Sequence, residues 1–190
     1  MNLTMDFGLA NLNKRYVFHA TIQEYSLDSE WSKTKQDNVW KPIIKLSNIY
    51  CRAPTTGLFE FAGNDAKISY TKSIAGLGQL ISGEVIEFKA RYVGGAISYS
   101  SLGQLMNPSK FRIVKPLIKQ RYPVPYSEYL RVGYVMEVNR DKLLNLNMYD
   151  QEIVDQYDDW CDTNVYKKKS WEGYTLNDVV VFLLTFPEIL

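Results

Sequence analysis

The sequence predicts a mainly β protein of the α+β class that ends in a helical tail. Apolar and polar residues alternate cleanly in residues 15–25 and 85–93, as they do in strands with one buried face. In residues 150–161 the apolar side chains Ile153, Val154 and Tyr157 instead recur at helical spacing. These two periods indicate a sheet that is followed by an amphipathic helix.

The remaining elements follow from the same periods and from the Gly, Pro and polar residues that interrupt them. We expect six strands, at residues 15–25, 40–50, 67–71, 85–93, 110–115 and 128–138. We expect the strands to be separated by loops at 26–38 and 53–65, and by a loop or short helix at 96–108.

Three-residue spacing of apolar side chains predicts a short helix at residues 73–80, with Ser73 as its N-cap. Helices are also expected at 140–146 and 150–161, whereas residues 176–186 fit either a helix or a strand. Residues of the same parity on these strands should be buried together in one core, namely Phe18, Ile22, Ile44, Leu46, Ile86, Phe88 and Ala90. Leu77 from the short helix should close one end of this core.

The element order over residues 15–116 is strand, long loop, strand, strand, helix, strand, strand. The passage TKSIAGLGQLISGEVIEFKARY, residues 71–92, combines the helix, a Gly turn and the strongest strand. This order resembles the OB-fold, a Greek-key barrel whose helix lies between the third and fourth strands. The resemblance implies an OB-like barrel of five to six strands in residues 1–138, with residues 139–190 as an acidic helical appendage packed on it.

A duplication offers a different organisation. The tripeptide Ile68-Ser69-Tyr70 recurs at residues 97–99, and Leu77-Gly78-Gln79-Leu80 recurs at residues 102–105. Because the spacers between the two parts differ in length, both coincidence and a small strand–helix–strand repeat stay open.

Composition restricts the class of protein. The chain of 190 residues is 46% hydrophobic and 14% aromatic, enough to fill a core and unlike a disordered chain. No apolar stretch is long enough to span a membrane, and the first residues do not resemble a signal peptide. We therefore expect a cytoplasmic protein in which Cys51 and Cys161 are free thiols.

Motifs for catalysis are not found. His19 is the single histidine, and no nucleophile or acid motif accompanies it. One histidine and two distant cysteines do not provide the four ligands of a zinc site, and no phosphate-binding Gly-rich loop occurs. The expectation is a protein that is not an enzyme and that uses neither a metal nor a cofactor.

Charge and aromatic residues suggest a ligand. Residues 1–120 hold 15 Lys and Arg against 9 Asp and Glu, whereas residues 121–190 hold 7 against 12. Single-stranded nucleic acid requires flat rings on which bases stack and cations along its backbone. The residues that we expect to bind it lie in the first loop and on the second and third strands: Trp31, Lys33, Lys35, Lys45, Arg52, Lys67 and Tyr70.

The acidic segment gives the alternative function. If the predicted helix at 150–161 continues to residue 162, four carboxylates share one face, namely Asp155, Asp158, Asp159 and Asp162. Like charges at this spacing repel one another. A basic protein partner would relieve that repulsion, as in an interaction or inhibitor protein of the phage or mobile-element accessory type. A divalent cation or a solvated face would also account for it.

Overall fold

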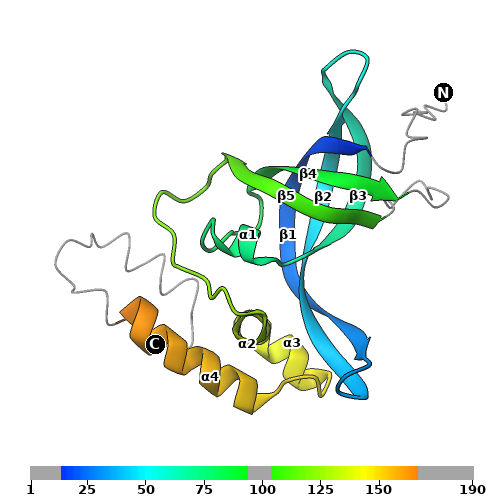
Figure 1. Ribbon diagram of the computed structural model, residues 1–190. Coiled ribbons are helices and arrows are strands. Elements are labelled where there is room, and N and C mark those ends of the chain that lie inside the picture. Colours follow the sequence, from blue (N-terminus) through cyan, green and yellow to red (C-terminus); the bar gives the residue numbers. More distant parts are fainter. Residues whose placement is uncertain (1–13, 94–103, 167–190) are drawn as a thin grey trace.

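The computed structural model describes residues 14–93 and 104–166. In these residues the protein is mainly β, with five antiparallel strands in one open sheet and a few helices beside it (Figure 1). The elements, in chain order, are β1 (Arg15–Ser32), β2 (Asp37–Arg52), β3 (Phe59–Ser69), α1 (Lys72–Ala75), β4 (Val85–Val93), β5 (Gln104–Lys115), α2 (Glu128–Val138), α3 (Arg140–Asn145), α4 (Gln151–Cys161) and the π-helical turn η1 (Asp162–Tyr166).

Strand β1 lies at the centre of the sheet, whose order is β3-β2-β1-β4-β5. The two edge strands are β3 and β5, and no hydrogen-bonded ladder joins them in the residues that the structure describes. Some of their Cα atoms nevertheless lie within 8 Å of one another. The predicted mainly β, α+β class is confirmed, and the sheet itself is open.

The β1–β2 hairpin is much longer than the sequence indicated. Residues 26–38, predicted as a loop, continue β1 to Ser32 and begin β2 at Asp37, so that Trp31 lies opposite Asn38. Figure 1 shows that this end of the hairpin extends past β4 and β5 toward α2 and α3. Most residues from Ser29 to Asn38 are exposed, so this end of the hairpin lacks the alternation of buried and exposed side chains that marks a strand.

The predicted core is confirmed. Phe18 of β1 and Phe88 of β4 are paired in register, and their rings stack with centroids 5.7 Å apart. Each of the seven predicted strand residues is almost fully buried in the same cluster, and Leu77 packs against it as a partly buried side chain. Tyr16 and Ala20 also face inward, as the alternation of the first strand predicts.

Residues 128–138 form α2 and not the sixth strand that their alternation predicted. All residues from Arg131 to Met136 are buried, because α2 packs both on the β1–β2 hairpin and on α4. A run that is buried all round has no diagnostic period, and its alternating apolar members resemble a strand. At Gly133 the helices approach so closely that an added Cβ would lie 2.7 Å from the Cβ of Tyr157.

Three other boundaries differ from the prediction. Strand β3 begins at Phe59, inside the predicted loop 53–65, and residues 104–108 belong to β5. Helix α1 is a single turn with Thr71 as its N-cap instead of Ser73. Gly78 follows it with a φ of 77°, which ends the helical path that was predicted to reach residue 80.

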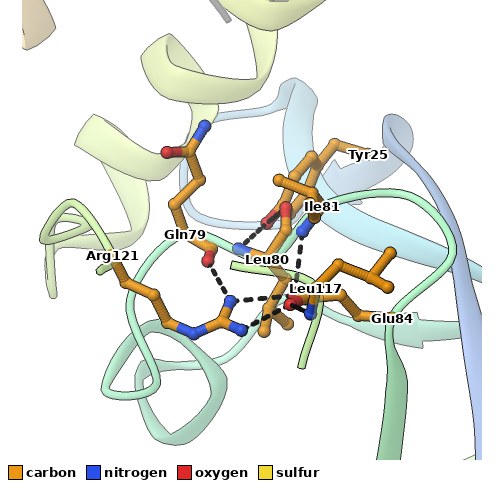
Figure 2. A network of polar contacts seen from close by, with 7 residues as sticks. All are labelled: Tyr25, Gln79, Leu80, Ile81, Glu84, Leu117 and Arg121. Atoms are coloured by element: carbon orange, nitrogen blue, oxygen red, sulfur yellow. Dashed lines mark hydrogen bonds and ion pairs between the residues drawn. The ribbon is translucent and has the colours of Figure 1, made fainter. Parts of the chain in front are cut away.

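A buried network fixes the segment that leads from the sheet to the helices (Figure 2). Glu84, at the start of β4, is fully buried, and its carboxylate pairs with the guanidinium of Arg121. The backbone N–H groups of Ile81 and Leu117 also donate to this carboxylate, at 3.1 and 2.9 Å. The chain between β5 and α2 is therefore held against the turn that precedes β4.

Several predictions lie outside the described residues. These are the choice between helix and strand at 176–186, most of the second copy of the possible repeat, and the first part of the loop at 96–108. The division of the chain into residues 1–138 and 139–190 stays a prediction. Within the described residues, no helix has the length and apolar character required to cross a bilayer.

Candidate nucleic-acid interface

The predicted site residues of the first loop lie at the tip of the β1–β2 hairpin. Trp31 is 55% exposed, and Lys33 and Lys35 are exposed in the turn that follows. Beside the tip is a cleft of about 740 Å³ between the hairpin and the helices α2 and α4. Its lining includes two lysines, Lys35 and Lys41, but also three carboxylates, Asp37, Glu128 and Asp150. The cleft is therefore poorly suited to a polyanion.

Lys45 on β2 and its neighbour Lys67 on β3 lie farther from the tip and are already paired. Lys45 Nζ lies 2.6 Å from a carboxylate oxygen of Glu24, and Lys67 Nζ lies 2.6 Å from one of Asp28. The hydrogen bonds from these lysines hold the pKa of each carboxyl below its usual value. Both pairs are partly exposed, so a phosphate competes with a local carboxylate for each lysine.

Tyr70 belongs to the core and not to a binding surface. It is 1% exposed, and its ring centroid lies 5.1 Å from that of Tyr25. Tyr134 of α2 packs edge-on against Tyr25 at 5.2 Å. Burial raises the pKa of Tyr70 well above its ordinary value. No base can stack on this ring, because the sheet and α2 enclose it.

Arg52 lies at the opposite end of β2 from the hairpin tip. Its guanidinium is exposed and lies over the ring of Phe59, 5.0 Å from the centroid. The seven predicted residues therefore do not form one patch. They occupy the hairpin tip, the middle of β2 and β3, and the far end of β2, and one is internal.

The structure instead brings together a row of side chains, one from each strand, that the sequence did not reveal as a set. Across the sheet, from β3 through β2, β1 and β4 to β5, the residues paired in register are Phe61, Tyr50, His19, Glu87 and Arg112. The rings of Tyr50 and Phe61 meet edge-on at 5.6 Å and are 40% and 44% exposed. Two large rings thus remain accessible side by side on β2 and β3.

The centre of the row is tightly connected. The imidazole of His19 stacks on Phe59, with ring centroids 3.7 Å apart and an interplanar angle of 19°. His19 Nε2 lies 2.9 Å from Glu87 Oε2, and Arg112 donates to the same carboxylate through Nε at 2.7 Å and Nη2 at 2.9 Å. These contacts, the Arg112 hydrogen bonds above all, lower the pKa of Glu87 to about 2.

Cations extend the row along β1 and β4. Arg15 pairs with Arg91 and Val17 with Lys89, so that these three charged side chains share the parity of His19 and Glu87. All three are exposed. Arg15 is held by the backbone oxygens of Lys89 and Asn107 and by Ser109 Oγ at 2.6 Å.

We call this surface the outer face of the sheet. It comprises the rings of His19, Tyr50, Phe59 and Phe61, the cations Arg15, Arg52, Lys89, Arg91 and Arg112, and the carboxylate Glu87. Part of it could have been recognised earlier, because the alternation in residues 85–93 already places Glu87, Lys89 and Arg91 on the polar side. The cross-strand register, which sequence alternation does not encode, is what places them beside the rings.

Asp155, Asp158 and Asp159 on α4, and Asp162 at the start of η1, are all exposed, as expected for a face that points away from the protein. Val154, Tyr157 and Cys161 on the opposite side of α4 are buried. Partial removal from water, together with the charge of Glu137, raises the pKa of Asp158 to about 6. The face is thus crowded with negative charge.

Nothing in the described residues gathers three or more His, Cys, Asp or Glu side chains around a possible metal position. Both thiols are buried, and burial raises the pKa of Cys51 to about 12 and that of Cys161 to about 11. Neither thiol is therefore an effective nucleophile at neutral pH.

Comparisons with protein-family models, with curated proteins and with solved structures found no match for this chain. The chemistry of the outer face is therefore the basis for a functional proposal.

Proposed function

We propose that this protein is a non-enzymatic binding protein for single-stranded nucleic acid, and that the strand lies across the outer face. The observation that carries the proposal is the pair of exposed rings, Tyr50 and Phe61, in the same row as the exposed guanidinium of Arg112. Rings and cations on one continuous face are the two features that a single strand requires.

The rings suit unpaired bases. Tyr50, Phe61 and the stacked pair of Phe59 and His19 lie on the neighbouring strands β1, β2 and β3. Bases in a duplex are already stacked on their neighbours, so they cannot lie flat on protein rings unless the duplex opens. An aromatic face of this kind therefore favours single strands over duplexes.

The cations suit the phosphates. The residues that define the outer face include five cations and one carboxylate, and the carboxylate is paired with Arg112. Each phosphate that a cation contacts releases condensed counterions, which gives a salt-dependent affinity. The bases would lie over β2 and β3, and the sugar–phosphate backbone would run along β4 and β5.

The topology supports the same site. Helix α1 lies between β3 and β4, β1 pairs with both β2 and β4, and β3 and β5 approach within 8 Å. We propose that these strands form an OB-type barrel that is closed between β3 and β5. OB-folds bind oligonucleotides on the face of their second and third strands, and those strands here carry Tyr50, Arg52, Phe59 and Phe61.

A salt titration tests the proposal. Fluorescence anisotropy with a labelled oligothymidylate of about 16 nucleotides, near the upper site size of one OB-fold, should show binding that weakens as salt rises. Lys89→Ala and Arg91→Ala should each reduce the slope of log K against log salt by about 0.7. An absence of binding at about 50 mM salt, where such contacts are strong, would reject the function.

A second candidate function comes from α4. Its exposed aspartates and the raised pKa of Asp158 favour a basic protein partner, which would offset the repulsion between them. In that case the fourfold replacement of Asp155, Asp158, Asp159 and Asp162 by Asn should abolish the complex and leave oligonucleotide binding intact. A pull-down from lysate, followed by measurement with the purified partner, distinguishes the two functions.

A further inference from the structure

Glu87 is the one carboxylate among the residues that define the outer face, and it lies where a polyanion would be expected to meet only cations. Both of its oxygens are engaged, one by Arg112 Nε and the other by Arg112 Nη2 and His19 Nε2, at distances from 2.7 to 2.9 Å. Its side chain is mostly covered, whereas that of Arg112 is mostly exposed. The carboxylate therefore sits beneath the groups that reach solvent.

Glu87 fixes Arg112 without using all of its donors. A guanidinium has five N–H groups, and the paired contact occupies one on Nε and one on Nη2. Three N–H groups remain for a phosphate, which accepts hydrogen bonds from a guanidinium in the same forked geometry. An unpaired arginine would have to lose its side-chain freedom when it binds, and this loss weakens binding.

Glu87 also orients His19. Its contact with Nε2 holds the imidazole in the plane that stacks on Phe59, on which Arg52 lies in turn. One carboxylate on β4 thus determines the position of a cation on β5 and of a stacked group that extends over β1, β2 and β3.

We propose that Glu87 is a positioning residue of the nucleic-acid interface, and that it strengthens binding to a polyanion although its own charge is negative. The inference rests on the proposed function. Removal of the Glu87 carboxylate should therefore lower the affinity for the oligonucleotide. Simple electrostatics predicts the opposite, because removal of a carboxylate from a face that binds phosphate should increase affinity.

The test compares Glu87→Gln with Asp65→Asn by anisotropy with the same oligothymidylate. Asp65 is exposed on β3 and opposite Ser47, and it contacts neither His19 nor Arg112, so its replacement matches the charge change alone. Asp65→Asn should leave binding unchanged or slightly tighter. Glu87→Gln should weaken binding about fivefold or more, the equivalent of at least one stacked base.

A second variant keeps the charge constant. Arg112→Lys retains the cation but cannot make the forked contact with Glu87, so binding should weaken while the slope of log K against log salt stays unchanged. Nuclear Overhauser contacts between the rings of His19 and Phe59 should be lost in Glu87→Gln, a readout that requires no ligand. Melting temperatures of both variants near that of the wild type show that the fold is retained.

Two results would overturn the inference. If Glu87→Gln binds more tightly than wild type, by as much as Asp65→Asn or more, Glu87 is only a repulsive charge. If the ring contacts of His19 persist in Glu87→Gln, the carboxylate does not position them. Both results differ from failure of the proposed function, in which the wild-type protein itself does not bind the oligonucleotide.

Discussion

The carboxylate of Glu84 and the guanidinium of Arg121 form a buried ion pair that joins the start of β4 to the segment before α2 (Figure 2). Arg121 also donates through Nη1 to the backbone oxygen of Gln79 at 2.6 Å. The next residue, Leu80, exchanges two hydrogen bonds with the hydroxyl of Tyr25, at 2.9 and 3.0 Å. The pair is thus part of a network that connects β1, the turn before β4 and the helical end of the chain.

Loss of this pair should be costly. Glu84→Gln leaves the partly buried Arg121 guanidinium without its counter-charge, and we expect a loss of about 3 kcal/mol in the free energy of unfolding. Asp28→Asn, which breaks the partly exposed pair with Lys67, should cost less than about 1 kcal/mol. Urea unfolding at pH 7 measures both. Equal effects would contradict the structural importance of the buried pair.

The contribution of the Glu84–Arg121 pair to stability depends on pH in a defined direction. Burial alone would raise the pKa of Glu84, but hydrogen bonds from Arg121 and from the backbone of Leu117 and Ile81 hold it below its ordinary value. The folded state therefore binds this proton more weakly than the unfolded chain. The stabilisation is present above the unfolded pKa of about 4.3, and it is lost as the pH falls through the folded pKa. Glu84→Gln should have a flatter stability profile there.

Gly133 tests the packing of α2 on α4. An added Cβ would lie 2.7 Å from the Cβ of Tyr157 and 2.8 Å from the backbone oxygen of Ile153, which cannot move without shifting α4. Gly133→Ala should therefore destabilise the protein by about 1–3 kcal/mol, although alanine is the better helix former.

Gly76→Ala is the matched control. Gly76 has an α-helical φ of −63°, and the nearest atom to its added Cβ lies 3.6 Å away. This change should leave stability unchanged or raise it by about 0.4–1 kcal/mol. Thermal melts of the two variants give the comparison, and a stable Gly133→Ala protein would show that the helices are packed less closely than described.

The crowded acidic face gives a prediction with the opposite pH sign. The pKa of Asp158 is raised to about 6, so the folded state holds this proton more tightly than the unfolded chain, whose Asp titrates near about 3.9. Stability should therefore fall as the pH rises from about 4 to 6. Asp158→Asn should raise stability at pH 7, by less than about 1 kcal/mol because the side chain is exposed.

Urea unfolding at pH 5 and pH 7 measures this difference. Asp159→Asn removes the same charge from the next, solvent-exposed position and serves as the control. If Asp158→Asn and wild type show the same change in stability between the two pH values, the carboxyl of Asp158 does not couple to its neighbours.

The parts of the fold that alternation could predict are those with one covered face. Residues 15–25 and 85–93 were correctly predicted as strands, and Phe18 and Phe88 as core, because burial against the opposite face imposes a period of two. The hairpin tip was missed because most residues from Ser29 to Asn38 are exposed, so no regular alternation of buried and exposed side chains marks the strands there. Helix α2 was misassigned because it is buried on several sides, which hides the helical period.

The candidate site was less predictable than the fold, because it depends on which residues are paired between neighbouring strands. Composition indicated aromatic and basic residues in β2 and β3, and of the selected residues Arg52 is a member of the outer face. The pairing of His19 with Tyr50 and that of Glu87 with Arg112 depend on register shifts in the β1–β2 and β4–β5 ladders, which no local pattern specifies. Tyr70 looked similar to Tyr50 in sequence, but it lies on the inner side of the sheet.

The last prediction decides between the two aromatic locations on the hairpin. Trp31 is at the tip, and Tyr50 and Phe61 are at the far end of β2 and at the start of β3. On the outer-face proposal, Tyr50→Ala and Phe61→Ala should each weaken oligonucleotide binding by about 1–3 kcal/mol per stacked base, with little change in the salt slope. Trp31→Ala should leave affinity unchanged and alter stability by no more than about 0.5 kcal/mol, because its side chain is exposed.

The reverse pattern would place the nucleic acid at the hairpin tip. In that pattern Trp31→Ala weakens binding, and the double replacement of Lys33 and Lys35 by Ala lowers the slope of log K against log salt by about 1.4. Anisotropy titrations at two salt concentrations separate these outcomes, since each location predicts which variants change affinity and which change its salt dependence.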